Sequence, residues 1–247
     1  MSNNLKNKRA LVTGGSRGIG AGIIRRLALE GVDVALTYVS KPDQAFEVAK
    51  AAREQGVRAI TIQADSADPK AVVAAVEQMV AELGGIDILV NNAGIIVIAP
   101  VDEFRLEDFD RTVAVNIRGV FVATQAAVKH MQAGGRIITI GSCNADRMPF
   151  AGGAVYAMSK AAMVGLVKGL ARDLGPRGIT INNIQPGPIA TDMNPADSDV
   201  ADTLRNLMAL PRYGSADEIA AMVAYLASPE ASYVTGASLT IDGGFTA

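Results

Sequence analysis

Short apolar runs alternate with longer amphipathic segments along almost the whole chain of 247 residues. Each apolar run has the length of a strand that is buried on both faces, and each longer segment has helical spacing of its apolar residues. The alternation predicts βαβ units, in which a helix connects two parallel strands. Because such crossovers are right-handed, they favour a doubly wound α/β sheet with helices on both faces. A TIM barrel is the main alternative, but it needs eight units, and the chain offers seven candidate strands.

The candidate elements leave no linker or low-complexity tract, so a single domain over residues 1–247 is expected. The candidate strands cover residues 9–14, 33–39, 57–65, 86–94, 135–142, 178–187 and 237–243. The candidate helices cover residues 19–31, 42–56, 68–85, 106–131, 152–174 and 215–228. Asp68 is the expected N-cap of the third helix, with Pro69 in its first turn.

The composition excludes several classes of protein. Hydrophobic residues make up 49% of the chain and charged residues 19%, which allows a large core. A net charge of −2 gives no basic surface for a nucleic acid polymer or an anionic membrane. Apolar runs are broken by glycine or charge short of a membrane span, and the first fifteen residues lack the apolar core of a signal peptide. One cysteine, Cys143, and one histidine, His130, make neither a disulfide nor a metal site, and a cytoplasmic location is expected.

A glycine-rich turn, "TGGSRGIG" (residues 13–20), lies between the first strand and the first helix. Glycines allow a tight turn and a close approach of the backbone, and the helix N-terminus offers free N–H groups to a pyrophosphate. An ordinary structural turn is the alternative, but the position after the first strand favours a dinucleotide. The residues expected to contact the cofactor here are Gly14, Ser16, Arg17, Gly18, Ile19 and Gly20.

The end of the second strand predicts which dinucleotide binds. An NAD site usually has Asp or Glu there to bond the ribose 2′-hydroxyl, whereas this chain has Tyr38 followed by Val39, Ser40 and Lys41. Without a carboxylate to repel it, a 2′-phosphate can be held by Arg17, Lys41 and the Ser40 hydroxyl. NADP(H) is therefore the predicted cofactor, although Lys41 could equally be a solvated loop charge.

Three further strand ends carry candidate cofactor contacts. Asp65, with its neighbour Ser66, follows the third strand and could accept a hydrogen bond from the adenine amine or instead cap a helix. The stretch "NNAG" (residues 91–94) follows the fourth strand, and "PGPIAT" (residues 186–191) follows the sixth. The candidate contacts in these two stretches are Asn92, Ala93, Gly94, Pro186, Gly187, Ile189 and Thr191.

Tyr156 and Lys160 are four positions apart on a helix that is otherwise mostly small and apolar. This spacing puts both side chains on one helix face. A surface hydrogen bond would explain the pair, but a phenol whose pKa is lowered by a nearby ammonium could also donate a proton to a carbonyl. Ser142, at the end of the fifth strand, could hold the carbonyl oxygen, and Asn116 could hold a water that relays protons to Lys160.

These motifs together resemble the short-chain dehydrogenase/reductase family. "TGGSRGIG", "NNAG", Asn116, Ser142, "YAMSK" and "PGPIAT" occur in the family's order over essentially the whole chain. The resemblance implies a Rossmann domain, a catalytic tetrad of Asn116, Ser142, Tyr156 and Lys160, and a nicotinamide held by Lys160 and the "PGPIAT" loop. It also implies preference for NADP through Arg17, and a homotetramer in which the C-terminal segment "VTGASLTIDGGF" contributes to a subunit interface.

An NADPH-dependent reductase of a small ketone is the function expected first. Two alternatives remain. One is a 3-oxoacyl-acyl-carrier-protein reductase: Arg177 matches one carrier-docking position, whereas the other falls in the neutral stretch "QAGG". The second is a cyclic-di-GMP-binding regulator on a reductase scaffold, which "GSCNADRMP" and "PGPIATDMNPA" resemble.

Two segments are expected to form the substrate side of the site. The stretch from Cys143 to Val155 should line the pocket, with Cys143 a packed neighbour of Ser142 rather than a nucleophile, and with Asp146 and Arg147 paired to each other. Residues 190–212 are predicted to form a mobile lid, although an ordinary surface helix would also fit. The apolar residues expected on the lid are Met193, Leu204, Leu207 and Met208.

Overall fold

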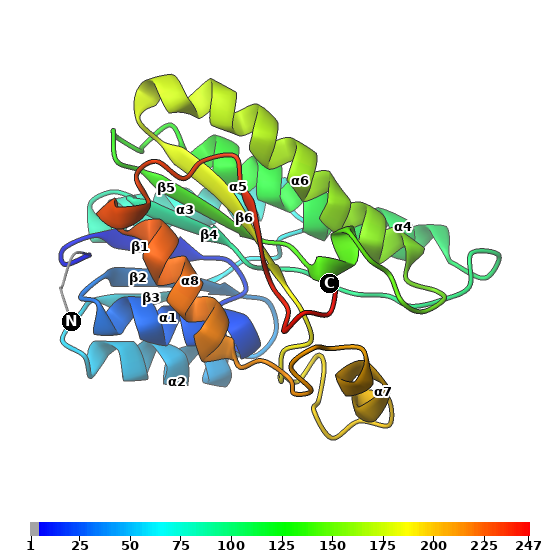
Figure 1. Cartoon of the computed structure of the whole chain (residues 1–247). Helices are drawn as coiled ribbons and strands as arrows, with labels where there is room; N and C mark the ends of the chain where they lie inside the picture. Colours follow the sequence, from blue (N-terminus) through cyan, green and yellow to red (C-terminus); the bar gives the residue numbers. More distant parts are fainter. Residues whose placement is uncertain (1–4) are drawn as a thin grey trace.

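Seven parallel strands form one sheet in the computed structural model, which describes residues 5–247 (Figure 1). The strand order is β3-β2-β1-β4-β5-β6-β7, so the chain reverses direction across the sheet between β1 and β4. This order confirms the doubly wound α/β fold. The strands are β1 (Arg9–Val12), β2 (Asp33–Tyr38), β3 (Ala59–Gln63), β4 (Ile88–Asn91), β5 (Arg136–Ile140), β6 (Thr180–Pro186) and β7 (Ser238–Ile241).

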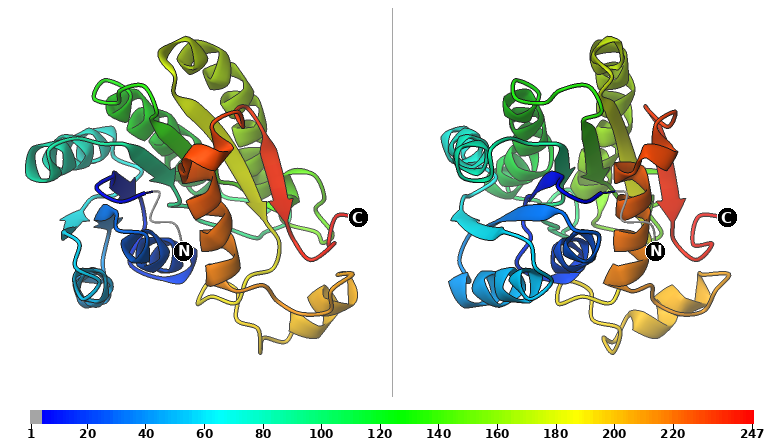
Figure 2. Two further views of the ribbon diagram at one scale, coloured as in Figure 1. Left: turned by 60° about the vertical axis from the view of Figure 1, so that its left-hand side comes forward. Right: turned by 90° about the vertical axis from the view of Figure 1, so that its left-hand side faces the viewer.

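Helices cover both faces of the sheet (Figures 1 and 2). One face carries α1 (Gly18–Leu29), α2 (Pro42–Arg53) and α8 (Ala216–Ala227). The other carries α3 (Pro69–Leu83), α5 (Gly119–Ala127) and α6 (Ala154–Leu174), with α4 (Leu106–Val113) beside α6. A short helix, α7 (Ala201–Asn206), lies beyond the carboxyl ends of the strands, on the same side as the C-terminus (Figure 1).

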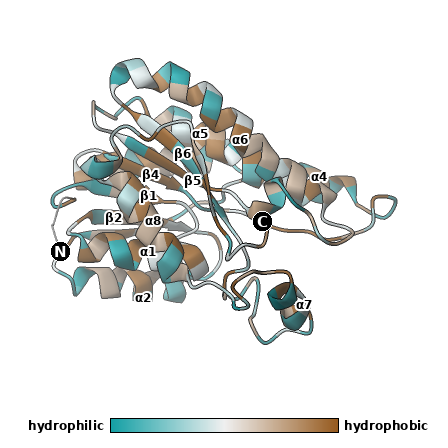
Figure 3. Cartoon of the chain, in the orientation of Figure 1, coloured by the Kyte–Doolittle hydropathy of each residue, from teal (hydrophilic) through white to brown (hydrophobic). Residues whose placement is uncertain are grey.

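Each face of the sheet has its own apolar core. In β1, Ala10 and Val12 pack toward α1 and α8, whereas Leu11 packs toward α3 and α5. Successive side chains of a strand point to opposite faces, so a strand between two helix layers has to be apolar at every position. The central strands are accordingly apolar along most of their length (Figure 3).

Two helices, α3 and α8, begin with side-chain caps. The Asp68 carboxylate accepts a hydrogen bond from the Lys70 backbone N–H at 2.8 Å, and Pro69 stands in the first turn of α3, as predicted. At α8, Ser215 and Glu218 form a capping box, each side chain accepting from the backbone N–H of the other. Such caps fix where a helix begins, because they satisfy N–H groups that have no partner within the helix.

The predicted continuous helix over residues 106–131 needs a correction. The segment contains α4, then a π-helical turn, η1 (Ala114–Arg118), and then α5, which ends at Ala127. A π turn holds one residue more than the regular helix, so it leaves the apolar pattern almost unchanged and cannot be seen in the sequence. Asn116 lies within this turn.

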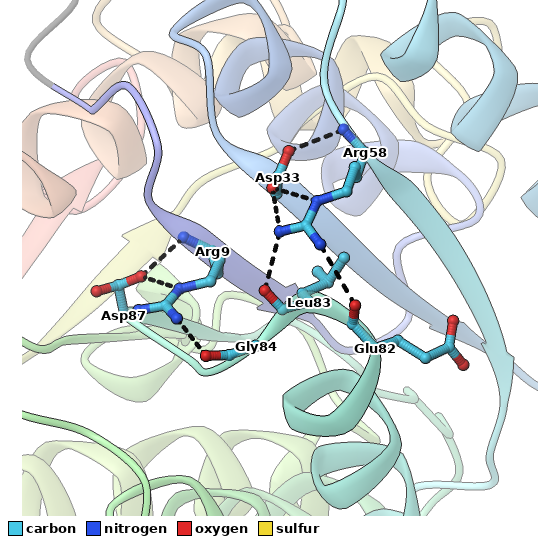
Figure 4. A network of polar contacts seen from close by, with 7 residues as sticks. All are labelled: Arg9, Asp33, Arg58, Glu82, Leu83, Gly84 and Asp87. Carbon is cyan, nitrogen blue, oxygen red and sulfur yellow. Dashed lines mark hydrogen bonds and ion pairs between the residues drawn. The ribbon is translucent and has the colours of Figure 1, made fainter.

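Ion pairs join the amino ends of the strands (Figure 4). Asp87, just before β4, accepts from the backbone N–H of Arg9 at 3.0 Å and from its Nε at 2.7 Å. Asp33, the first residue of β2, is bonded in the same way by the backbone and the Nε of Arg58, which precedes β3. Arg9 and Arg58 also donate to backbone carbonyls at the end of α3. Four strands are therefore tied together at this edge.

The apolar run of α6 is interrupted by Lys160 and Lys168, as expected. Among residues 5–247, α6 with the turn after it (residues 154–177) nevertheless contains an 18-residue window of mean hydropathy 1.2 and is long and apolar enough by length and composition. Its inner face, however, buries Ser159, Lys160 and Met163. A core helix of a globular fold passes the same test of length and composition.

Candidate functional site

A cleft of about 440 Å³ opens at the carboxyl ends of the strands. It is lined by the glycine-rich turn, by the loops after β2 to β6 and by the segment that carries α7. Every residue predicted to contact the cofactor lines this cleft, as do Ser142, Tyr156 and Lys160. Asn116 does not line it, although its side chain lies directly behind it.

The glycine-rich turn is anchored to the end of β4. The Thr13 hydroxyl accepts from the backbone N–H groups of Asn92 and Ala93, and the Asn92 amide donates to the carbonyls of Thr13 and Gly14. A Cβ added at Gly20 would lie 2.5 Å from the Gly14 carbonyl oxygen, so only glycine fits there. The turn thus presents the N-terminus of α1 to the cleft in a fixed position.

The cationic residues predicted to hold a 2′-phosphate both line the cleft. Lys41 follows β2 together with Ser40, and no carboxylate stands in this loop. The Arg17 guanidinium lies 3.8 Å from the Asp192 carboxylate, and both side chains are at least half exposed. An exposed pair of this kind contributes little to stability, so Arg17 is available to a stronger anion.

Asp65 is engaged differently from the expected contact with adenine. Its two carboxylate oxygens accept from the guanidinium of Arg111 at 2.9 and 3.0 Å, and one also accepts from the Ala67 N–H. Burial works against ionisation of Asp65, but the hydrogen bonds from Arg111 and Ala67 and the charge of Arg111 together outweigh it and lower the pKa of the carboxyl. Asp65 does not cap a helix, because the N-cap of α3 is Asp68, and its partner Arg111 is part of the cleft wall.

Tyr156, Lys160 and Ser142 come together where α6 passes the end of β5. The Lys160 ammonium lies 5.7 Å from the centre of the Tyr156 ring and donates to the Ile140 carbonyl at 2.9 Å. The Ser142 hydroxyl accepts from the Asn144 N–H at 3.1 Å. The Gly94 backbone lies beside this ammonium, since a Cβ added there would be 3.4 Å from the Lys160 nitrogen.

Burial dominates the protonation of this group. Desolvation raises the pKa of Tyr156, and the hydroxyl of Ser142 opposes the rise only in part. Desolvation lowers the pKa of Lys160 to about 8. The predicted lowering of the Tyr156 pKa by the ammonium is therefore wrong for the chain alone, because both groups are removed from water.

The Asn116 side-chain amide is engaged in hydrogen bonds within the protein rather than free to hold a water. Its oxygen accepts from the Ile95 N–H, and its nitrogen donates to the Ile95 carbonyl and to the Ser159 hydroxyl, at 2.9 to 3.0 Å. It thereby joins the π turn, the loop after β4 and α6. A proton relay from Asn116 to Lys160 would therefore have to use an Asn116 atom other than the side-chain nitrogen.

The segment predicted to form a lid, residues 190–212, contributes to the wall of the cleft. Met193 and Leu204 line the cleft, and Leu207 and Met208 pack behind it in a small apolar cluster that includes Cys143. Burial raises the pKa of the Cys143 thiol to about 12, in agreement with a packed neighbour of Ser142. One expectation fails here, because Asp146 accepts from Gln185 and Arg147 donates to the Phe245 carbonyl instead of pairing with each other.

Comparison with known proteins agrees with this geometry. A family model described as enoyl-(acyl carrier protein) reductase matches residues 14–246. A relative from Escherichia coli, described as a cyclic-di-GMP-binding biofilm dispersal mediator protein, is 50% identical over 240 residues, 97% of this chain and 98% of that protein. A short-chain dehydrogenase/reductase from Serratia marcescens is 58% identical, covers 99% of this chain and 100% of its own, and superposes with a TM-score of 0.97.

The chain belongs to the short-chain dehydrogenase/reductase family. Another solved member, a short-chain dehydrogenase from Burkholderia cenocepacia in complex with NADP, is 55% identical, with a TM-score of 0.98 and coverage of 99% of this chain and 100% of its own. The resemblance inferred from the motifs is thus confirmed over nearly the whole length.

Several side chains in the cleft of this short-chain dehydrogenase/reductase were not predicted to line it. They are Ile95, Ile96, Arg111 and Phe245. The apolar run after "NNAG" could have indicated the two isoleucines, because such a run is unusual in a loop. Arg111 looks like an ordinary surface charge on a helix, and Phe245 lies beyond the last strand, so only the folded chain brings them to the cleft.

Proposed function

We propose that this short-chain dehydrogenase/reductase reduces a small ketone to an alcohol with NADPH. The observation that carries the proposal is the position of Tyr156, Lys160 and Ser142 in the same cleft as the glycine-rich turn. One end of the cleft has cations and glycines suited to phosphates, and the other end is mainly apolar. This division matches a dinucleotide at one end and a neutral carbonyl compound at the other.

The cofactor end supports NADP(H) over NAD(H). Arg17 and Lys41 line it, and the loop after β2 has no carboxylate to repel a 2′-phosphate. The Burkholderia relative was solved with NADP, which agrees with this choice. The proposed contacts are Gly14, Ser16, Arg17, Gly18, Ile19, Gly20, Tyr38, Ser40, Lys41, Asp65, Ser66, Asn92, Ala93, Gly94, Tyr156, Lys160, Pro186, Gly187, Ile189 and Thr191.

Bound NADPH would supply the hydride, and the protein's own residues would manage the proton and the carbonyl. Tyr156 is the proposed acid, because a phenol of raised pKa keeps its proton until the alkoxide forms. Ser142 is proposed to hold the carbonyl oxygen as negative charge develops on it. Lys160 is proposed to stabilise the Tyr156 phenolate. Asn116 is proposed to fix the groups around Lys160 through its hydrogen bonds with Ile95 and Ser159.

Substitution of the proposed acid tests the reaction. Tyr156→Phe should lower kcat by about 10²- to 10⁴-fold, the range for loss of a general acid, while NADPH binding stays close to that of the parent. NADPH absorbance measured with a panel of small ketones gives kcat, and fluorescence titration gives the cofactor affinity. Turnover in Tyr156→Phe equal to that of the parent would exclude Tyr156 as the acid.

Substitution of Arg17 tests the cofactor preference. Arg17→Ala should weaken NADPH by about tenfold, the usual loss for one charge-assisted contact, and should leave NADH almost unchanged. Lys50→Ala, on the exposed face of α2, is the matched control for loss of one positive charge. Equal weakening of both cofactors would contradict the contact with the 2′-phosphate.

Two alternative functions have different support. The identity to the Escherichia coli relative favours a cyclic-di-GMP-binding regulator as the second candidate. A carrier-linked reductase is less well supported, because Arg177 donates to the Val128 and Met131 carbonyls at the end of α5, and the second docking position is neutral. Absence of turnover on every ketone, together with submicromolar binding of cyclic-di-GMP, would replace the reductase proposal with the regulator.

Assembly and location are part of the same proposal. The outer faces of α5 and α6 leave Phe121 and Met158 about two-fifths exposed, which suits contact with a second copy in a homotetramer. Sedimentation analysis would measure the mass, and a monomer would contradict the proposal. Cytoplasmic location is proposed from the single buried cysteine.

A further inference from the structure

The C-terminal segment, residues 242–247, forms part of the cleft wall. Phe245 lines the cleft, although only 1% of its surface is exposed. The segment is folded on itself, because the Asp242 carboxylate accepts from the backbone N–H groups of Gly244 and Thr246 and from the Thr246 hydroxyl. Its backbone also joins the predicted lid, since the Leu210 N–H donates to the Gly243 carbonyl at 2.8 Å.

Phe245 links the loop after Ser142 to the predicted lid. Its ring packs in a buried cluster to which the loop contributes Cys143 and the lid region contributes Ala201, Met208 and Tyr213. Leu204, which lines the cleft, packs against the same cluster. A change in the size or position of this ring would therefore alter both the shape of the cleft and the support under the lid.

Arg147 contacts both the backbone and the ring of Phe245. The guanidinium donates to the Phe245 carbonyl at 2.5 Å and lies 5.6 Å from the centre of the ring. Gln185, buried on β6, fixes the loop that carries Arg147 by donating to the Ser142 carbonyl at 3.2 Å and to the Asp146 carboxylate at 2.9 Å. The contacts run without a break from the central sheet to the C-terminal segment.

We infer that Phe245 is a specificity-determining residue that limits the bulk of the substrate, and that Arg147 is its positioning residue. The substrate part of this inference rests on the proposed reductase function. Leu204 packs against the Phe245 cluster, and Phe150 and Met193 line the same cleft; because none of the three is charged, the group accommodated here is a neutral, apolar substituent of the ketone. The buried ring limits the depth of the cleft wall, which disfavours the larger substituents.

Paired substrates test the specificity role. In Phe245→Leu and Phe245→Ala, the ratio of kcat/KM for a phenyl ketone to kcat/KM for butanone should rise about tenfold, since a missing group in an apolar pocket changes selectivity by that order. Arg147→Ala should raise the same ratio, and Arg147→Lys should restore part of the parent value. The KM for NADPH should stay unchanged in all four variants. Tyr233→Ala, a fully exposed aromatic side chain, is the control.

A second measurement does not depend on turnover. Cys143 is the only cysteine and lies in the Phe245 cluster, so its rate of labelling by a thiol reagent reports the packing of that cluster. Labelling should become at least about tenfold faster in Phe245→Ala and Arg147→Ala. Leu27→Ala, which destabilises the separate core around α1, should leave the labelling rate almost unchanged under native conditions.

The two measurements separate the possible failures. If the parent reduces no ketone but Cys143 labels faster in the Arg147 and Phe245 variants, the reductase proposal fails while the positioning of Phe245 by Arg147 stands. If the parent reduces ketones and the substrate ratio does not change in Phe245→Leu, the specificity role is overturned. If Cys143 labels equally fast in Arg147→Ala and Leu27→Ala, the positioning role is overturned.

Discussion

The two ends of the sheet use charge in opposite ways. At the amino ends, Arg9, Asp87, Asp33 and Arg58 satisfy one another and nearby backbone groups (Figure 4). At the carboxyl ends, Lys160 is buried, and within residues 5–247 it has one backbone carbonyl as its hydrogen-bond partner and no ion pair with a carboxylate. Paired charges stabilise the fold, whereas a buried ammonium without a counter-ion lowers its stability and stays free to act in the proposed reaction. The amino-end edge of the sheet therefore holds the strands together, and the carboxyl-end edge is the proposed reaction site.

The largest effect should come from removal of the buried ammonium. Burial lowers the pKa of Lys160 from 10.5 to about 8, so between these values the unfolded chain binds more protons than the folded one, and stability rises with pH. Lys160→Met should therefore be more stable than the parent by about 3 kcal/mol at pH 7, by the linkage between pKa shift and free energy, and this advantage should fade toward pH 10.5.

Urea denaturation of both proteins from pH 6 to 10 measures the difference. Comparison across pH removes the constant contribution of the bond to the Ile140 carbonyl. An advantage of Lys160→Met that is the same at every pH would contradict the cost of the buried charge and would weaken the contrast between the two ends.

The next effect concerns Asp87 at the amino end. Burial disfavours its charged form, but the hydrogen bond and charge of Arg9 more than compensate and lower the pKa of the carboxyl. Because the folded pKa is the lower one, the stabilisation is complete above about pH 4, the unfolded value, and is lost as the pH falls through the folded pKa. Asp87→Asn should cost about 1–3 kcal/mol at pH 7 and much less in acid.

The kinetic readout completes this test. Asp87→Asn should keep the parent's kcat and KM below its melting temperature, because the change lies at the edge of the sheet opposite the cleft. Denaturation at pH 7 and pH 3 gives the stability, and NADPH absorbance gives the rate. A loss of turnover at unchanged stability would show that the two ends are not separate in function.

The smallest effect should come from Arg58. Its side chain is 57% exposed, although it reaches Asp33 and the carbonyls of Leu83 and Glu82. Arg58→Ala should cost less than about 1 kcal/mol, the usual value for an exposed pair, and added salt should reduce the cost further. Arg105→Ala, which removes a still more exposed pair, is the control in the same denaturation experiment. A loss of several kcal/mol, insensitive to salt, would place Arg58 among the essential contacts.

The sequence predicted the fold because the alternation of strands and helices has few solutions. The seven parallel strands, both helix layers and the N-cap of α3 agree with the prediction. The cofactor contacts were also accessible, because they follow strand ends that a doubly wound sheet brings to one edge. Ser142 could be named for the same reason and Tyr156 and Lys160 for their spacing of four positions on a helix, and the structure brings all three together in the cleft.

The remaining features depend on long-range packing that leaves no local pattern. The π turn around Asn116 differs from a regular helix by a single residue per turn. The bond between Arg111 and Asp65 joins positions 46 residues apart, and the one between Arg147 and Phe245 joins positions 98 apart. The raised pKa of Tyr156 depends on burial, which the spacing of Tyr156 and Lys160 does not reveal.

The reversal of strand order between β1 and β4 divides the work of the chain. The part up to β3 and its loop contributes the glycine-rich turn, Lys41 and Asp65, whereas the later part contributes Ser142, Tyr156, the α7 segment and Phe245. The contacts proposed for the phosphates and the adenine of the cofactor thus lie mostly in the first stretch, whereas those proposed for the nicotinamide and for substrate choice lie in the second. Under the proposed function, changes in the α7 segment and at Phe245 could alter which compound is reduced while the glycine-rich turn continues to hold the same cofactor.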